Sequence, residues 1–280
     1  MKKHLWFLVV GILAAAAIVI FAATPRQTTA AHEQAPVTLY LHGHFGNAHS
    51  MQALMTRAEQ VDNAQQVLTA TVDSHGQVTF TGHWLARVRR PLVKVVFQDN
   101  RTLNYDLISD WLHNVLVGLR ARYGVKKFNI VAHSLGNAAV LYYELRYGKD
   151  HKLPQLQRYA AIAGNFDGIP GMHMQPRNNR IQRSGQPRFL APDFRRAMLD
   201  RDSIPAGQID FLNVYGDWDD TGSDGRIFNA SSRALGWLVA GRARSYREAK
   251  FTGARAQHSQ LRTNPKVART VDEFLWAARK

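Results

Sequence analysis

A serine placed between an apolar strand and a helical segment constrains this chain more than any other sequence feature. The mostly apolar residues 127–132 predict a buried strand, and residues 137–147 are predicted to be helical. The intervening segment Ala132-His133-Ser134-Leu135-Gly136 matches a small-x-Ser-x-Gly turn, with alanine in the first small position. Bulky side chains two positions from the serine would collide in so sharp a turn. The pattern therefore predicts that Ser134 is raised above the end of a sheet, at the start of a helix.

Strands alternate with helices along most of the chain. Apolar runs at 36–41, 92–97, 159–163 and 209–215 predict strands, whereas 50–60, 105–123 and 267–278 predict helices. Two β-rich runs, 67–72 and 78–81, flank Asp73-Ser74-His75-Gly76, which is a hairpin signal. This order predicts one α/β domain over residues 31–280, with a mostly parallel sheet covered by helices on both faces.

The composition excludes several classes of protein. The 280 residues include no cysteine, which excludes disulfide scaffolds, thiolate zinc sites and cysteine nucleophiles. Lysine and arginine number 36 against 21 acidic residues, a net charge of +15. Such a charge predicts attraction to polyanions.

The N-terminus predicts export from the cytoplasm. Lys2 and Lys3 precede an uncharged apolar run at 5–23, so residues 1–30 are interpreted as a signal peptide or an uncleaved signal anchor. A small-residue cleavage site at Thr28-Thr29-Ala30 fits the first alternative. Either alternative places the domain outside the cytoplasm. We therefore expect the positive charge to meet an anionic membrane or a cell-wall polymer, and no nucleic acid.

A basic segment interrupts the alternation of strands and helices. Residues 172–206 hold seven arginines against three aspartates. Long connections inside a compact domain usually cover or bind something. We expect a cap insertion at about 170–207 over the active edge of the sheet, with a solvated surface excursion as the alternative.

An activated serine needs a base, and His258 is the predicted base. In the nucleophile-elbow architecture the chain order is serine, acid, histidine, and His258 lies late in the chain, just before the last predicted helix. The side chain of His133 is expected to point away from Ser134, while His151 and His173 lie in less suitable loops.

The acid is expected just after the strand at 209–215. Asp217, Asp219, Asp220 and Asp224 all lie there, and Asp224 is chosen because Ile227 and Phe228 return to the core and would bury its carboxylate. The same loop partly matches an EF-hand, but its twelfth position is Phe228, which cannot bind calcium. A looser metal site at Asp217 and Asp219 stays open in this reading. The prediction includes neither a metal nor a cofactor.

The loop after the first strand is predicted to complete an oxyanion hole. His42-Gly43-His44-Phe45-Gly46 follows that strand, and its glycines allow close approach of the backbone to a substrate. The expected donors are the amides of Leu135 and His44, with Phe45 as the alternative second donor. His42 and His44 are not expected to bind a metal, because no third ligand at a suitable spacing accompanies them.

Several segments resemble a family of extracytoplasmic bacterial α/β-hydrolases, the cell-surface hydrolases of unassigned substrate. The similar segments are residues 42–47, 71–76, 96–100, 132–136, 163–168, 222–227 and 258–265. The resemblance implies an α/β-hydrolase fold of lipase or esterase type, with Ser134, Asp224 and His258 as the catalytic triad. This sequence has Ala132 and Asn137 where the family usually has glycine, and Asn137 adds polar bulk beside the elbow.

Together these features predict an extracytoplasmic serine hydrolase that cleaves carboxylic esters through an acyl-enzyme. Its substrate would be a small or lipid-like acyl ester. An amidase or peptidase with the same triad is one alternative. A second alternative is a non-catalytic cell-surface binding protein on a hydrolase scaffold, suggested by the excess arginine at 172–206 and at Arg242, Arg244, Arg247 and Arg255.

Overall fold

A computed structural model describes residues 35–85, 87–171 and 179–276 of the chain. The predicted signal segment, residues 1–30, lies outside these ranges, as do residues 172–178 of the predicted cap. Among the helices in these ranges, none combines the length and the apolar character needed to cross a bilayer.

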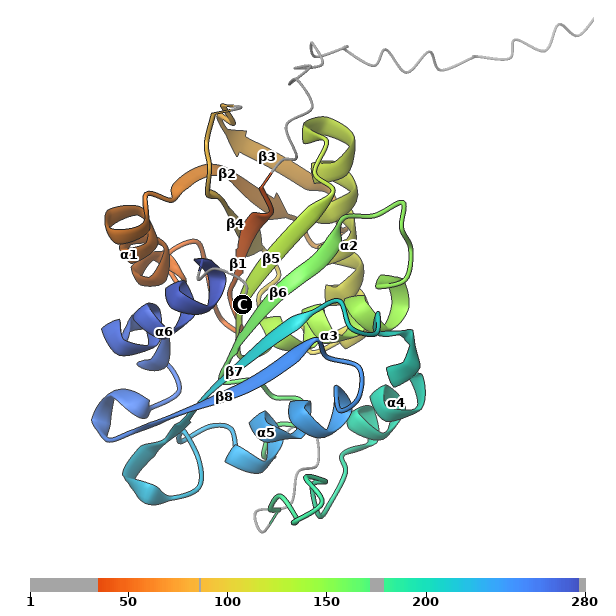
Figure 1. Cartoon of the computed structure of the whole chain (residues 1–280), viewed down its shortest axis with the longest axis vertical. Helices are drawn as coiled ribbons and strands as arrows, with labels where there is room; N and C mark the ends of the chain where they lie inside the picture. Colours follow the sequence, from red (N-terminus) through yellow and green to blue (C-terminus); the bar gives the residue numbers. More distant parts are fainter. Residues whose placement is uncertain (1–34, 86, 172–178, 277–280) are drawn as a thin grey trace, which may run out of the picture.

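The centre of the molecule is an eight-stranded sheet with the order β3-β2-β4-β1-β5-β6-β7-β8 (Figure 1). All neighbouring strands pair in parallel except β2 and β3, which form the predicted antiparallel hairpin. The strands are β1 (Val37–Leu41), β2 (Gln65–Val72), β3 (Val78–Gly82), β4 (Pro91–Phe97), β5 (Lys127–His133), β6 (Gln155–Ile162), β7 (Asp210–Asp217) and β8 (Ser245–Thr252). The predicted α/β fold with a mostly parallel sheet is confirmed.

Helices cover both faces of the sheet (Figure 1). The helices α2 (Tyr105–Tyr123), α3 (Gly136–Tyr147) and α5 (Asn229–Leu238) share one apolar cluster with one face. The helices α1 (Gln52–Asp62) and α6 (Pro265–Trp276) share a second cluster with the other face. A sixth helix, α4 (Pro192–Asp200), lies within the predicted cap and contacts α3, where the Tyr142 hydroxyl donates to the Asp193 carbonyl at 2.9 Å.

The strand β8 was not predicted from the sequence. It lies at the edge of the sheet, and its residues are exposed or half-buried along its whole length. Charged side chains such as Arg247, Glu248 and Lys250 are typical of an edge strand, where they discourage pairing with another chain. The apolar alternation on which strand prediction depends is therefore missing from this segment.

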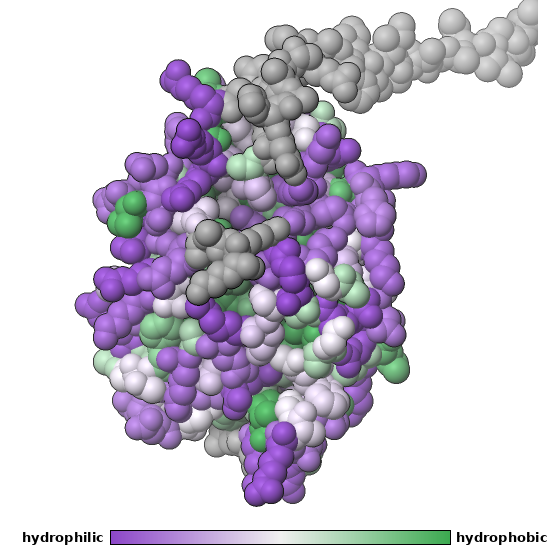
Figure 2. Space-filling view, in the orientation of Figure 1, coloured by the Kyte–Doolittle hydropathy of each residue, from purple (hydrophilic) through white to green (hydrophobic). Residues whose placement is uncertain are grey.

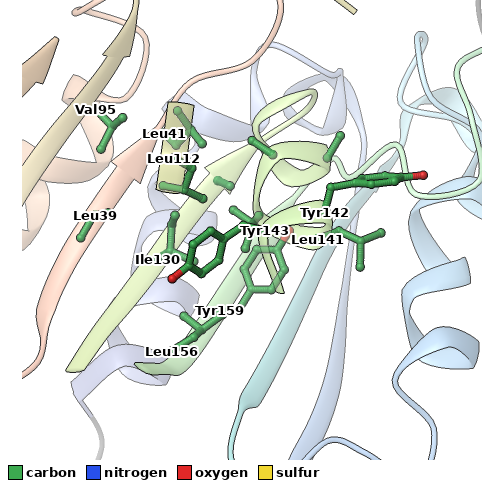
Figure 3. Close-up of a cluster of buried hydrophobic side chains, with 14 of the residues drawn as sticks. Leu39, Leu41, Val95, Leu112, Ile130, Leu141, Tyr142, Tyr143, Leu156 and Tyr159 are labelled. Atoms are coloured by element: carbon green, nitrogen blue, oxygen red, sulfur yellow. The ribbon is translucent and has the colours of Figure 1, made fainter. Parts of the chain in front are cut away.

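The helix α3, which follows the serine turn, is buried almost all round. Ten of its twelve residues are buried, from Gly136 to Leu145. Figure 3 shows Tyr143 of α3 and Tyr159 of β6 in the layer between this helix and the sheet. Burial on every side fixes the position of the helix, and with it the position of the turn from which the helix starts.

One acidic side chain of α3, Glu144, is enclosed in the protein. Both carboxyl oxygens of Glu144 are buried, and neither has a hydrogen-bond partner among the described residues. Burial away from water disfavours the charged form and raises the pKa of Glu144 from its ordinary 4.5 to about 8. Glu144 is therefore a neutral carboxylic acid in the folded protein at pH 7.

The pKa of Glu144 predicts a pH-dependent stability. The folded protein keeps this proton up to about pH 8, whereas the unfolded chain loses it near pH 4.5. The stabilisation is complete below pH 4.5 and is lost as the pH rises towards 8, a decrease of about 2–4 kcal/mol. In urea unfolding between pH 5 and 9, Glu144→Gln should remove this part of the slope. Glu273→Gln, at an exposed position of α6, should keep it; equal slopes for both variants would contradict the assignment.

Candidate active site

Ser134 occupies the strained turn that the sequence predicts. Its φ of 53° lies in the left-handed region, a backbone conformation that residues other than glycine rarely adopt. The Ser134 amide donates to the Ile162 carbonyl at 2.9 Å, which ties the turn to the end of β6. The turn thus connects the last residue of β5 directly to the first residue of α3.

Asn137 holds this turn from beneath. Its amide nitrogen donates to the carbonyls of Ser134 and Ile162, each at 3.0 Å, and its side-chain oxygen accepts from the Tyr159 hydroxyl at 2.8 Å. The residue is fully buried. The polar side chain of Asn137 thus lies beside the elbow, on the side of the core, and satisfies carbonyl groups that a glycine would leave to other donors.

The loop after β1 lies against the serine turn. A Cβ atom at Gly43 would stand 2.7 Å from Ser134 Cβ and 3.2 Å from the Leu135 nitrogen. A Cβ atom at Gly136 would stand 2.6 Å from the His42 carbonyl oxygen. The distances of 2.7 and 2.6 Å are too short for real atoms, so glycine at 43 and 136 is what allows the two backbones to meet.

The structure brings Ser134, His258 and Asp224 together in one hydrogen-bonded chain. His258 Nε2 lies 2.9 Å from Ser134 Oγ, and His258 Nδ1 lies 2.7 Å from Asp224 Oδ2. A carboxylate can only accept, so Nδ1 donates to Asp224, and Nε2 of the neutral ring is left to accept the serine proton. The exposed fractions are 8% for Ser134, 6% for His258 and 1% for Asp224.

Asp224 is fixed by its own turn. Its second oxygen, Oδ1, accepts from the amides of Arg226 at 2.9 Å and Ile227 at 2.7 Å, and its backbone carbonyl accepts from the His258 amide at 2.8 Å. Ile227 is buried, as expected for the apolar flank of this turn. Every oxygen of Asp224 is thereby oriented, and one carboxylate oxygen is directed at the imidazole.

Asp217, another of the four candidate acids, is buried but bonds to groups other than His258. Asp217 forms an ion pair with Lys250 at 2.6 Å and accepts from the Gly222 amide at 2.8 Å. The amine of Lys250 and the amide of Gly222 together lower the pKa of Asp217, against the opposing effect of burial. Within the described ranges, no three His, Cys, Asp or Glu side chains are grouped as metal ligands.

His133 supports His258 instead of contacting the serine. Its Nε2 lies 3.0 Å from the His258 carbonyl oxygen, which can only accept, so Nε2 carries the proton. The two rings lie 4.8 Å apart. Complete burial, followed by the neighbouring His258, holds the pKa of His133 well below 6.5. His133 is therefore a neutral donor that ties the loop of His258 to the end of β5, a contact that the sequence analysis missed.

Two of the three predicted oxyanion-hole amides are free to bind. Over the described ranges, the amides of His44 and Leu135 have no hydrogen-bond partner within the protein. The Phe45 amide donates to the Asn100 carbonyl at 2.8 Å. Phe45 as the alternative second donor is therefore wrong for this conformation, because its N–H already closes the loop onto the segment after β4.

His42 braces this loop from inside. Its Nε2 accepts from the Phe97 amide at 3.0 Å, which leaves Nδ1 to donate to the Gly43 carbonyl at 2.9 Å. Burial lowers the pKa of His42, in keeping with a neutral ring. Both ring nitrogens are occupied by the protein, which agrees with the expectation that His42 does not bind a metal.

The predicted cap is attached behind β6 by a buried aspartate. Asp167 accepts from the Ala191 amide at 2.6 Å and from the Asn179 side chain at 2.8 Å. Asp167 belongs to residues 163–168, one of the segments that carry the family resemblance. That this segment caps the site stays a prediction, and so does the alternative that it is a solvated surface excursion. Of the other histidines considered, His151 is exposed before β6, at the opposite edge of the sheet, and His173 lies outside the described residues.

Most of the chain matches a family of α/β hydrolases and two solved structures. A family model described as "Alpha/beta hydrolase of unknown function (DUF915)" matches residues 25–278. The product of the Listeria innocua gene lin2722 is 27% identical, with a TM-score of 0.79 over 89% of this chain and 96% of that one. A Lactobacillus plantarum WCFS1 protein, named as a candidate cell surface hydrolase, is 19% identical, with a TM-score of 0.73 over 89% of this chain and 94% of its own. Among curated proteins, no sequence matches this chain.

Removing the Asn137 side chain should destabilise the serine turn. Asn137→Leu keeps a similar volume but leaves the buried carbonyls of Ser134 and Ile162 without this donor, which should cost about 2–4 kcal/mol in urea unfolding. The matched control is Asn114→Leu in α2, which removes a single, partly buried bond to the Gly76 carbonyl and should cost about 1 kcal/mol. A smaller loss for Asn137→Leu than for Asn114→Leu would contradict this role.

Proposed function

Because this chain belongs to the family of α/β hydrolases of unknown function that matches residues 25–278, we propose that it is a serine hydrolase that cleaves carboxylic esters through an acyl-enzyme. One observation carries the proposal: the continuous hydrogen bonding from Asp224 through His258 to Ser134, at 2.7 and 2.9 Å. These are the contacts that a serine hydroxyl requires to lose its proton during attack.

In the acylation step, Ser134 Oγ attacks the ester carbonyl carbon while His258 Nε2 takes the hydroxyl proton. Asp224 stabilises the imidazolium that forms, since its Oδ2 already accepts from Nδ1. The carbonyl oxygen becomes an oxyanion next to the free amides of His44 and Leu135. His258 then returns the proton to the ester oxygen, the alcohol leaves, and Ser134 carries the acyl group.

Deacylation repeats these steps with water. His258 takes a proton from a water molecule, whose oxygen attacks the acyl carbon. The second tetrahedral intermediate collapses as His258 returns the proton to Ser134 Oγ, and the carboxylic acid leaves. Each oxyanion donor should contribute about 2.7–4 kcal/mol to transition-state stabilisation in both steps.

Exposed aromatic residues favour an apolar or acyl substrate. Phe45 is 59% exposed and follows β1, and Trp218 is 38% exposed and follows β7. Both lie at the edge of the sheet that carries Ser134. The guanidinium of Arg101 lies 5.5 Å from the Phe45 ring, so a cation is also present at this rim. Amide hydrolysis would use the same three side chains, and we propose esters as the first substrates to test.

The binding-protein alternative has less support. Of the arginines that motivated it, Arg242 pairs with Asp202 at 2.9 Å and Arg244 forms an ion pair with Asp210. Arg242 thus joins the loop before β8 to the turn at 201–203, and Arg244 joins the same loop to β7, so both side chains are part of the fold. The proposed location outside the cytoplasm depends on the apolar run at 5–23.

Replacing the serine tests the proposed function. Ser134→Ala should abolish hydrolysis of short p-nitrophenyl esters and labelling by a fluorophosphonate probe, because both need the activated hydroxyl. Its unfolding midpoint should stay close to that of the parent. Ser245→Ala, at an exposed position in β8, is the control and should keep full activity. A binding protein would show no labelling in any form, and equal turnover by Ser134→Ala and the parent would refute the hydrolase mechanism.

Replacing the aspartates tests the choice of acid. Asp224→Asn keeps the shape but loses the carboxylate that holds the imidazolium, so kcat should fall by about 10³- to 10⁴-fold. Asp217→Asn removes only the ion pair with Lys250 and should leave kcat within about threefold. The measurement is kcat for one short ester in both variants. A large loss in Asp217→Asn with little loss in Asp224→Asn would reverse the assignment.

A further inference from the structure

Basic side chains gather at the edge of the sheet formed by the amino ends of its parallel strands, opposite the candidate active site. The parallel strands begin at this edge, and the charges lie in the loops before β4, β5 and β6 and on the first residue of β5. The members of this basic edge are Arg87, Arg89, Arg90, Lys126, Lys127 and Lys152. All are exposed except Arg90, which is half-buried.

Strand order places β1 in the middle of this basic edge. β1 lies between β4 and β5, and β6 comes next. Val37, the first residue of β1, pairs with Phe128, the residue after Lys127, and Thr38 pairs with Leu92, two residues after Arg90. The chain therefore enters the sheet between the arginines before β4 and the lysines before β5. In Figure 1 β1 begins in the upper part of the view, beside both loops.

Two aspartates, Asp62 and Asp150, contact members of the basic edge. Asp62 accepts from Arg90, and Asp150 uses its carboxylate to cap the Lys152 amide at 2.9 Å. Arg87, Arg89 and Arg90 also line a surface cleft of about 420 Å³ together with Asp62 and Asn63. In Figure 2 the surface near the loop between β3 and β4 is strongly hydrophilic. The edge thus combines excess positive charge with a hollow that can receive a phosphate-bearing headgroup.

We propose that the basic edge docks on the anionic phospholipid headgroups of a bilayer. The chain that precedes β1 carries Lys2, Lys3 and the apolar run at 5–23, and only a short polar stretch separates this run from the sheet. A membrane-inserted run would therefore keep the amino end of β1, and with it this edge, close to the lipid. Basic residues beside a membrane anchor add attraction to anionic lipid. The proposal does not depend on the serine hydrolase chemistry.

Docking in this way fixes the direction of the candidate active site. Ser134, Asp224 and His258 all follow the carboxyl ends of strands, whereas the basic edge precedes their amino ends. A strand of seven residues such as β5 spans about 23 Å. The serine would therefore face away from the bilayer that the domain rests on, and it would meet substrates from the aqueous side.

The absence of cysteine from the chain allows a direct test with single labels. In the full-length chain, His151→Cys places a fluorophore on the basic edge and Ser184→Cys places one in the segment after β6. The labelled proteins are mixed with phosphatidylcholine vesicles, with or without phosphatidylglycerol, that carry a headgroup quencher. We expect quenching at 151 but not at 184, stronger with phosphatidylglycerol and weaker in high salt.

A charge variant isolates the basic edge. Arg87→Gln, Arg89→Gln, Lys126→Gln and Lys152→Gln together should lower the docking equilibrium by about 10²-fold or more, at about fivefold per charge, and remove most quenching at 151. The control is Arg195→Gln, Arg255→Gln, Lys266→Gln and Arg269→Gln, which removes the same charge from exposed positions elsewhere and should preserve the quenching. Ester hydrolysis in solution should be unchanged in the edge variant, so failure of docking and failure of the hydrolase proposal are distinguishable.

Three results would overturn the proposal. The first is equal quenching at 151 and 184, which would mean that the domain has no preferred orientation. The second is quenching at 151 that does not respond to phosphatidylglycerol, to salt or to the edge variant. The third is release from phosphatidylglycerol vesicles by soluble polyphosphate at a much lower charge concentration than that of the lipid, which would identify a polymer-binding surface instead.

Discussion

The left-handed backbone of Ser134 is the constraint on which the rest of the site depends. A φ of 53° is unfavourable for serine, so the surrounding structure has to hold it. The Ile162 carbonyl takes the Ser134 amide, Asn137 bonds the carbonyls on both sides, and glycine at 43 lets the neighbouring loop close against the turn. The buried helix α3 then keeps this arrangement from relaxing. The strained backbone of the serine can therefore persist only because the structure beneath it is rigid.

Parallel pairing explains how residues far apart in sequence meet at this turn. β1, β5, β7 and β8 all end at the same edge, so the loops that follow them deliver His44, Ser134, Asp224 and His258 to one place. The sheet alone leaves the loops free to vary. His133 and the Asp224 carbonyl remove that freedom for the His258 loop, since they bond its backbone carbonyl and amide respectively. The proposed base is thus positioned through its main chain as well as through its ring.

The sequence predicts those parts of the molecule whose signals are local. Apolar runs located β1, β4, β5 and β7, and the strand-turn-helix pattern located Ser134. Strand prediction failed at β8, where an edge strand replaces apolar residues by charges such as Arg247 and Lys250. The hydrogen bonds of Asn137 were not predicted, because its partner carbonyl at Ile162 is distant in sequence. Phe45 was retained as a donor for the same reason: its bond to Asn100 exists only after folding. Long-range hydrogen bonds leave no periodic trace in a single sequence.

The position of β8 has a consequence for how heating would disrupt the candidate active site. His258 is carried by the loop after an edge strand that pairs on one side only, whereas Ser134 follows a central strand that is buried almost throughout. Local opening starts where fewest contacts resist it. Fraying of that outer ribbon would withdraw the imidazole while the remaining strands stay paired. Thermal inactivation would then occur below the unfolding temperature of the whole domain. The working lifetime of the protein would be set by the stability of β8 and not by that of the central strands.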